Sequence, residues 1–258
     1  MRAHGPVSRF WSDGGMASRI RIEQGLRGGL SIARGDDVLI VVVDVLSFST
    51  CVTVAADRGI EVIPARWRDG QAGAIARERD AVLAGPRGGP VVSLSPASIR
   101  RAEGVHRLVL PSPNGATLCA ELATQGIVVA GCLRNASAVA GACARHLERA
   151  PATSVAVIAA GERWGDDSLR PALEDVWGAG AILAALGLDH LASPEALAAA
   201  DAYRAGVMRG LPLAVLTSGR ELVDRGFAED VSIAGELDSS SVVPILRDGA
   251  FVLEAVLP

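Results

Sequence analysis

The strongest pattern in the chain is a wholly apolar stretch that ends in a single carboxylate. Residues 38–43 read Val-Leu-Ile-Val-Val-Val, Asp44 follows directly, and hydroxyl side chains come within the next few positions. An apolar run of this length is typical of a parallel strand that is buried on both faces. Ligands of open α/β sheets bind at the carboxyl ends of such strands. The pattern therefore predicts a buried strand that delivers Asp44 to this edge, with a helix N-terminus just beyond it.

Strands and helices are expected to alternate along most of the chain. Apolar or alternating runs predict further strands, and these fall at residues 18–30, 60–64, 107–110, 126–131, 154–160, 242–246 and 251–257. Segments with helical spacing or Ala-rich composition lie between them, at residues 49–57, 69–79, 116–123, 135–149, 173–186, 194–209 and 213–225. The Gly- and Pro-rich stretch 86–96 is predicted to be a loop. This alternation predicts an α/β fold with a largely parallel sheet.

The composition narrows the chemistry because the chain contains no lysine, so that all 25 basic residues are arginine. Schiff-base catalysis needs an amine nucleophile and a P-loop needs its lysine, so both are excluded. The net charge is −4 with both signs distributed throughout, and no basic stripe is interleaved with aromatic residues. We therefore expect no nucleic-acid partner, and we expect local arginines to meet any small anionic substrate.

Length and cysteine usage indicate the kind of protein. At 258 residues and 50% hydrophobic content the chain is long enough to bury a sizeable core. Residues 1–17 lack an apolar signal segment, so we expect a disordered polar extension before a single domain over 18–258, with Met16 as an alternative start. The four cysteines have no zinc-site spacing and predict buried, reduced thiols in a cytoplasmic protein. No apolar run approaches about 18 residues, so no membrane span is expected.

Polar residues cluster directly after several predicted strands. The first cluster joins Asp44 to the hydroxyl side chains of Ser47, Ser49 and Thr50. Unpaired backbone N–H groups at a helix start favour an anion, and these hydroxyls would lie beside them. An acid next to such an anion site indicates metal-assisted phosphate chemistry. The alternative is an ordinary strand end with an Asp or Ser N-cap.

Two more clusters follow the predicted strands at 107–110 and 126–131. Asn114 and Gly115 form the first, and the alternative is a simple Asn-Gly turn. Arg134 and Asn135 form the second, and the alternative is that Asn135 only caps the next helix. An arginine beside an N-cap at a strand end is also a good phosphate clamp.

Acidic residues form the last clusters. The stretch 161–167 contains three acids and leads to Glu174 and Asp175, which precede a helix of small residues. The helix dipole favours first-turn acids, but adjacent carboxylates at such a position also suit a hard cation such as Mg²⁺. Asp230 is a further candidate, although an acid in its position is more typical of the protein surface.

Other chemistries find less support in the sequence. None of the four histidines lies in a polar cluster, so a Ser–His or Cys–His nucleophile pair is not expected. Asp44 is followed by Val45 and Leu46, so the D-x-D motif of haloacid-dehalogenase-type phosphatases is missing. No G-x-G-x-x-G follows a strand, so a dinucleotide site is not predicted.

Five ordered motifs resemble those of the 2-phosphosulfolactate phosphatase family, the ComB-like proteins. The first is D-V-x-x-x-[ST]-T, and T-x-N-G, G-x-x-x-N-A-x-A-V-A, A-L-E-D-x-x-x-A-G and G-x-x-x-D-[IV] with a later V-V-P follow it. They are similar to residues 44–50, 112–115, 131–140, 172–180, and 226–231 with 242–244. Order and spacing agree over roughly residues 38–250, and five motifs together are specific where one alone would be weak.

The resemblance implies Mg²⁺-dependent hydrolysis of a phosphate monoester, most simply 2-phosphosulfolactate, by a three-layer α/β/α protein with a largely parallel or mixed central sheet. Asp44 and Glu174 would hold the metal, and Asp175 would orient or deprotonate a water. The phosphate and sulfonate oxygens would be bound by Ser47, Ser49, Thr50, Asn114, Gly115, Arg134 and Asn135. Attack by water and a transient aspartyl-phosphate on Asp44 both remain open. The small-residue helix from Gly178 to Leu186 is a candidate homodimer contact.

Two positions depart from the family pattern. Ser47 stands where many members have an arginine, and residues 111–113 replace a threonine run before the Asn-Gly. Since the missing arginine weakens anion binding, we expect Arg134 to replace it. The alternatives are a non-catalytic anion-binding protein and a broad-substrate phosphatase on the same fold.

Overall fold

The computed structural model describes residues 18–35, 37–66 and 70–253. The expected disordered extension over 1–17 lies outside these residues, as does the end of the strand predicted at 251–257. Within the described ranges no helix has the length and apolar character that crossing a membrane requires.

The centre of the fold is a nine-stranded mixed sheet. Across the sheet the strands run β1 (Ile20–Gln24), β7 (Ser154–Ala159), β2 (Val38–Val43), β6 (Ile127–Gly131), β10 (Pro244–Arg247), β11 (Ala250–Leu253), β3 (Glu61–Arg66), β5 (Arg107–Ser112) and β4 (Val82–Leu83). The neighbours from β1 to β6 are parallel, and so are those from β3 to β4. The β10–β11 hairpin pairs antiparallel on both sides and joins the two parallel parts. The expected α/β class and its sheet are therefore confirmed.

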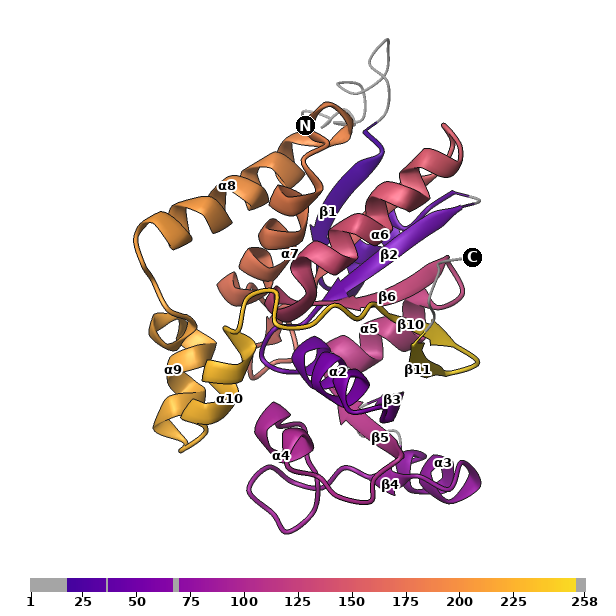
Figure 1. Ribbon diagram of the computed structural model, residues 1–258, viewed down its shortest axis with the longest axis vertical. Coiled ribbons are helices and arrows are strands. Elements are labelled where there is room, and N and C mark those ends of the chain that lie inside the picture. Colours follow the sequence, from indigo (N-terminus) through magenta and orange to yellow (C-terminus); the bar gives the residue numbers. More distant parts are fainter. Residues whose placement is uncertain (1–17, 36, 67–69, 254–258) are drawn as a thin grey trace, which may run out of the picture.

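Helices cover the sheet and complete its layers (Figure 1). The α-helices are α1 (Gly25–Ile32), α2 (Phe48–Asp57), α3 (Ala72–Glu78), α4 (Pro96–Arg100), α5 (Gly115–Leu122), α6 (Ala136–Arg149), α7 (Leu173–Leu186), α8 (Pro194–Met208), α9 (Thr217–Asp224) and α10 (Ala228–Ala234). Short 3-10 turns occur at Leu133–Asn135, Asp189–Leu191 and Leu213–Val215. In Figure 1, α6, α7 and α8 lie together in the upper part, while α3 and α4 lie at the bottom beside β4 and β5.

Strand β2 separates two hydrophobic cores. Leu39, Val41 and Val43 pack in one core with α6, α7 and α8, while the alternate residues pack in the other with α2, α4 and α5. Side chains alternate between the faces of a strand, so burial on both faces requires an uninterrupted apolar sequence. This is the physical reason why residues 38–43 are apolar throughout, as the sequence pattern predicts.

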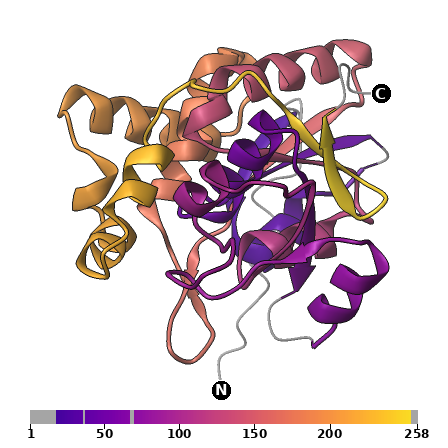
Figure 2. The same cartoon turned by 60° about the horizontal axis from the view of Figure 1, so that its bottom comes forward.

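The carboxyl ends of β2 and β5 meet, although four strands lie between β2 and β5 in the sheet. The backbone N–H of Gly115, just after β5, donates a hydrogen bond of 2.8 Å to the Asp44 carboxylate after β2. The two parallel parts of the sheet must therefore bend toward each other. The hairpin of β8 (Glu162–Arg163) and β9 (Leu169–Arg170) extends from the same edge, as Figure 2 shows.

The small-residue part of helix α7 packs inside the chain. A Cβ at Gly180 would lie 2.2 Å from the Ala199 carbonyl oxygen of α8, and one at Gly178 would lie 2.6 Å from the Val45 side chain. Residues 177–183 of this helix are all buried. Residues 177–183 therefore pack within the chain, whereas residues 184–186 are partly or fully exposed, and a contact of Gly178–Leu186 with a second subunit stays a prediction.

Several short elements escape prediction from the sequence. Helices α1, α4 and α10 and strands β4, β8 and β9 span eight residues or fewer, and tertiary contacts rather than local pattern stabilise such short elements. The helix predicted at 213–225 divides into a 3-10 turn and α9, because Leu216 between them is extended.

Candidate active site

Asp44 lies in the turn between β2 and α2 and is held by two backbone donors. Its Oδ1 accepts the N–H of Phe48 at 3.0 Å, and its Oδ2 accepts the N–H of Gly115 at 2.8 Å. A Cβ at Gly115 would lie 2.7 Å from this carboxylate, so only glycine allows the approach. Asp44 is 5% exposed and lines a small polar cavity. The orientation of its carboxylate at the cavity wall is therefore fixed.

The hydroxyls of Ser49 and Thr50 stabilise the same turn. Ser49 Oγ accepts the N–H of Asp44 at 3.1 Å and donates to the Val42 carbonyl at 2.9 Å. Thr50 Oγ1 donates to the Val45 carbonyl at 2.7 Å. Both residues are fully buried. The expectation that these two hydroxyls bind substrate is corrected: they serve the turn that presents Asp44.

Asn114 and Glu162 form the wall beside Asp44. Asn114 Nδ2 donates a hydrogen bond of 2.9 Å to Glu162 Oε2. Asn114 precedes α5, while Glu162 begins the β8–β9 hairpin just after β7. Asn114 was expected in the site from its place after a strand, whereas Glu162 was noted only within the acidic stretch 161–167, although an acid directly after a strand was a usable signal.

Glu174 and Asp175 open helix α7 and are both buried, but their surroundings differ. Asp175 Oδ1 accepts the N–H of Val45 at 2.7 Å, and its Oδ2 accepts the N–H of Gly161 at 2.8 Å. Within the described part of the chain no donor bonds the Glu174 carboxylate, which is 2% exposed. Asp175 thus ties the turn carrying Asp44 to the turn carrying Glu162. Both of its carboxylate oxygens are thus engaged by backbone donors, and the expectation that it orients or deprotonates a water stays a prediction.

Three adjoining cavities surround these side chains. The central one, of 160 Å³, is lined by Asp44, Ser47, Asn114 and Glu162 among others. A second of 570 Å³ shares Asn114 and Glu162 with it, and a third of 350 Å³ shares Ser218 with it and is lined by Glu174. The cavities meet at the carboxyl edge of the sheet, where ligands bind in α/β folds.

The carboxylates perturb one another. Burial raises the pKa of Asp44 to about 6; the N–H groups of Phe48 and Gly115 oppose this effect and the charge of Glu174 adds to it. Burial, followed by the charge of Asp44, raises the pKa of Glu162 to about 7. Burial also raises the pKa of Asp175, and the charges of Asp44 and Glu174 reinforce it. A site that holds several acids in this way favours a proton or a cation.

The donor set fits Mg²⁺. This ion takes carboxylate oxygens, and in phosphoryl-transfer sites one or two protein carboxylates suffice because substrate oxygens and waters complete the shell. Among the described residues no group of three or more His, Cys, Asp or Glu side chains is arranged to enclose a metal. Asp44 and the unbonded carboxylate of Glu174 could hold the ion in the open manner that Mg²⁺ prefers.

Arginine side chains also line the central cavity. Arg87 forms an ion pair with Asp230, and its Nη2 donates a hydrogen bond of 3.1 Å to Ser47 Oγ. Arg225 also lines this cavity. The expected surface position of Asp230 is wrong, because this residue is 1% exposed. Arg87 lies in the predicted 86–96 loop and only the fold brings it to Ser47, so no local sequence signal could have found it.

Arg134 and Asn135 lie outside this cluster, contrary to expectation. The Arg134 guanidinium bonds Asp57 at 2.9 Å and also pairs with Glu236. The Asn135 side chain bonds three backbone groups, of Cys132, Ala130 and Val242. Neither residue lines the three cavities. The expectation that Arg134 replaces the arginine missing at position 47 is wrong, because two carboxylates already occupy it.

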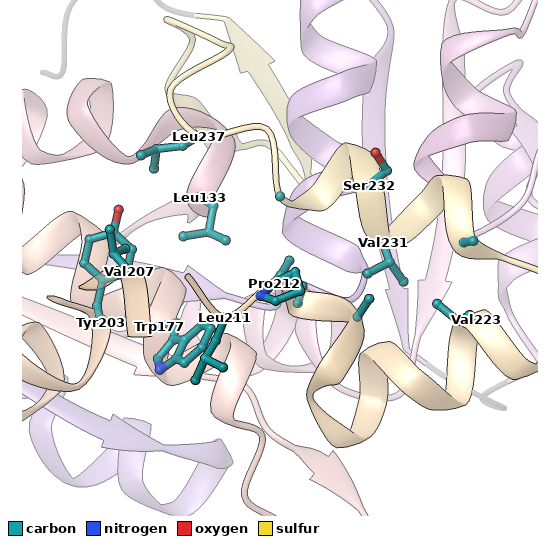
Figure 3. A pocket seen from close by; sticks show the side chains of 14 residues that line it. Leu133, Trp177, Tyr203, Val207, Leu211, Pro212, Val223, Val231, Ser232 and Leu237 are labelled. Carbon is teal, nitrogen blue, oxygen red and sulfur yellow. The ribbon is translucent and has the colours of Figure 1, made fainter. Parts of the chain in front are cut away.

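A larger cavity of 580 Å³, whose lining side chains Figure 3 shows, shares no lining residue with the three polar cavities. Trp177, Tyr203 and Leu211 are among its lining residues, and none of its fourteen lining side chains is charged. A phosphate group placed there would find no charged partner. A phosphorylated substrate is therefore expected at the polar cavities.

A small cavity lined by both carboxylates and arginines, at the carboxyl edge of a mixed sheet, defines an α/β protein with a polar site for a small charged ligand. A model of the 2-phosphosulpholactate phosphatase family matches residues 31–249. The chain therefore belongs to the 2-phosphosulpholactate phosphatase family, and the resemblance found in the sequence is confirmed.

Two relatives extend the comparison. A Methanothermobacter thermautotrophicus protein named 2-phosphosulfolactate phosphatase is 32% identical over 221 residues, which cover 83% of this chain and 89% of the relative. A Deinococcus radiodurans protein named "Probable 2-phosphosulfolactate phosphatase" is 32% identical over 221 residues, or 81% of this chain and 88% of the relative. The similarity thus spans most of both proteins.

The raised pKa of Asp44 predicts how stability depends on pH. A pKa raised from 3.8 to about 6 means that the folded state retains the proton longer, so this contribution is full below pH ~4 and is lost as pH rises through about 6. Relative to Asp44→Asn, the metal-free protein should lose on the order of 3 kcal/mol of unfolding free energy between pH 4 and 7. Urea titrations in EDTA measure this difference, and Mg²⁺ should reduce it. Parallel pH profiles for the two proteins would contradict the assignment.

Proposed function

We propose that the protein is a Mg²⁺-dependent phosphatase that releases inorganic phosphate from 2-phosphosulfolactate or a closely related phosphorylated hydroxy acid. Family membership supports the phosphatase reaction, and the names of the two relatives suggest the substrate. The observation that carries the proposal is the buried, unbonded carboxylate of Glu174, which lines the cavity adjoining that of Asp44 and whose charge acts on Asp44. Two buried carboxylates whose charges act on each other favour a bound cation, and a phosphate ester supplies the remaining oxygens.

Each residue of the site has a distinct role in the proposed reaction. Asp44 and Glu174 hold the cation, while the N–H groups of Phe48 and Gly115 fix the orientation of the Asp44 carboxylate. Bound Mg²⁺ would supply Lewis-acid polarisation of the phosphoryl group. Glu162, held by Asn114, exchanges a proton in the neutral pH range. Asp175 keeps the two turns that carry these acids in register.

Phosphate release from 2-phosphosulfolactate, 2-phospholactate and isopropyl phosphate tests the proposal. We expect hydrolysis of 2-phosphosulfolactate that EDTA abolishes and added Mg²⁺ restores. Release that is insensitive to EDTA would contradict the metal assignment. Equal rates on all three esters would favour a broad-substrate phosphatase. No release from any of them with Mg²⁺ would favour a non-catalytic anion-binding protein.

A further inference from the structure

We propose that Arg87 and Arg225 form a subsite for a second anionic group of the substrate, a carboxylate or sulfonate next to the phosphorylated carbon. The inference rests on the proposed function and names what selects the substrate. Two groups of charged side chains line the central cavity: Asp44 and Glu162, where the charge of Asp44 acts on Glu162, and Arg87 and Arg225, which both lie beside the Phe227 ring. If the phosphoryl group binds beside the acids, the rest of a small substrate extends toward the arginines.

Arg87 is fixed in place before any ligand arrives. Its side chain is 14% exposed and pairs through Nη1 with Asp230, while Nη2 donates to Ser47 Oγ. Its guanidinium also lies 5.2 Å from the centre of the Phe227 ring. Guanidinium carries five N–H donors, so donors remain for a ligand after these two contacts. Because the side chain is already ordered, binding costs little conformational entropy.

Asp230 is the positioning residue for Arg87. One of its oxygens accepts Ser95 Oγ at 2.6 Å and the Ala97 N–H at 3.1 Å, and the other pairs with Arg87. Asp230 lies in the first turn of α10 and is nearly fully buried, and its donors Ser95 and Ala97 lie at the start of α4. The starts of these two helices therefore hold its carboxylate in place. A residue held this firmly can direct a guanidinium toward one point in the cavity.

Arg225 adds a positive charge that no carboxylate neutralises. Among the described residues no acid lies within salt-bridge distance of its guanidinium, which lies 5.8 Å from the centre of the same Phe227 ring. A further acid that lines the cavity, Glu221, bonds Arg170 at 2.8 and 3.0 Å. The charge available to a ligand beside these arginines is therefore positive.

The position and size of the cavity favour a small substrate with neighbouring anions. At 160 Å³ it is smaller than the ~300–1,000 Å³ of usual ligand pockets. Arg87 reaches the hydroxyl of Ser47, three residues beyond Asp44 in the chain. A ligand that spans from Asp44 to Arg87 thus needs its two anionic groups close together, as in a phosphorylated 2-hydroxy acid.

Two esters that differ by one carboxylate test the subsite. 2-Phospholactate is isopropyl phosphate with one methyl group replaced by a carboxylate. We expect Arg87→Gln and Arg225→Gln each to lower the ratio of kcat/KM for 2-phospholactate to that for isopropyl phosphate by about 10- to 100-fold, chiefly through KM, because a charge-assisted hydrogen bond is lost. 2-Phosphosulfolactate shows whether sulfonate gives the same result. Arg209→Gln, exposed at the end of α8, is the matched control and should leave the ratio unchanged.

Each outcome is decisive for the subsite. An equal loss on both esters would overturn the inference, because the arginines would then bind the phosphoryl group, and an unchanged ratio would overturn it as well. Asp230→Asn should reproduce the selective loss of Arg87→Gln, and the double variant should add nothing to it; if Asp230→Asn does not fold, Arg225→Gln still decides. Failure of the proposed function looks different, since the wild-type protein would then hydrolyse neither ester.

Discussion

Replacing Asp44 by Asn is expected to lower Mg²⁺-dependent phosphate release by about 10³-fold or more. The substitution removes the negative charge that would hold the cation at the cavity wall. It also exchanges one acceptor oxygen for an NH₂ group that faces a backbone N–H, of either Phe48 or Gly115. The cost of this mismatch is offset near neutral pH, because the Asn side chain is uncharged and avoids the burial cost that raises the pKa of Asp44.

Steady-state kinetics and circular dichroism check this prediction together. Glu174→Gln should show a similar loss and a higher Mg²⁺ requirement, because it removes the second proposed ligand. Glu195→Gln, an exposed acid in the first turn of α8, is the matched control and should retain activity. If folded Asp44→Asn protein keeps wild-type phosphate release, Asp44 only caps the turn and the site assignment is wrong.

Replacing Asp175 by Ala is expected to lower the free energy of unfolding by about 2–6 kcal/mol. The side chain is the acceptor for two buried backbone donors, the N–H groups of Val45 and Gly161. A buried donor left without a partner costs about 1–3 kcal/mol. Activity should fall as well, because Val45 follows Asp44 and Gly161 precedes Glu162, so both acids lose their common anchor.

Chemical denaturation of Asp175→Ala and Asp175→Asn separates the two effects. The Asn variant keeps one acceptor and should lose less stability than the Ala variant. Asp224→Ala, an exposed acid at the end of α9, provides the matched control. Asp175→Ala protein with the stability of that control and with full activity would show that the two turns are held by other contacts.

Local pattern was sufficient for the long elements and for the acid that ends β2. Residues 38–43 must be apolar because both faces of β2 are buried, and this requirement is visible in the sequence itself. The place of Glu174 in the first turn of a helix was predicted for a similar reason, since acids in a first turn are a local feature. The four buried free cysteines also agree with the expectation from their spacing.

Local pattern misled wherever a polar side chain had two possible partners. Ser49, Asn135 and Arg134 each stand after a strand, as ligand-binding residues do, but their donors and acceptors are used by the protein itself. A hydroxyl, an amide or a guanidinium binds backbone or carboxylate groups as readily as phosphate oxygens. The sequence does not determine which of these partners lies within hydrogen-bond distance of the side chain in the folded protein.

The sequence by itself determined the α/β class, the buried strand β2 and the placement of Asp44 at its carboxyl end, because hydrophobic periodicity and burial act over a few neighbouring residues. Only the tertiary structure decided which side chains meet Asp44. Glu162 and Arg87 are distant from it along the chain, and they reach the same cavity because the sheet bends and because Asp230, 143 residues beyond Arg87, holds that guanidinium in place. Such contacts depend on the relative positions of whole elements, which no short stretch of sequence encodes.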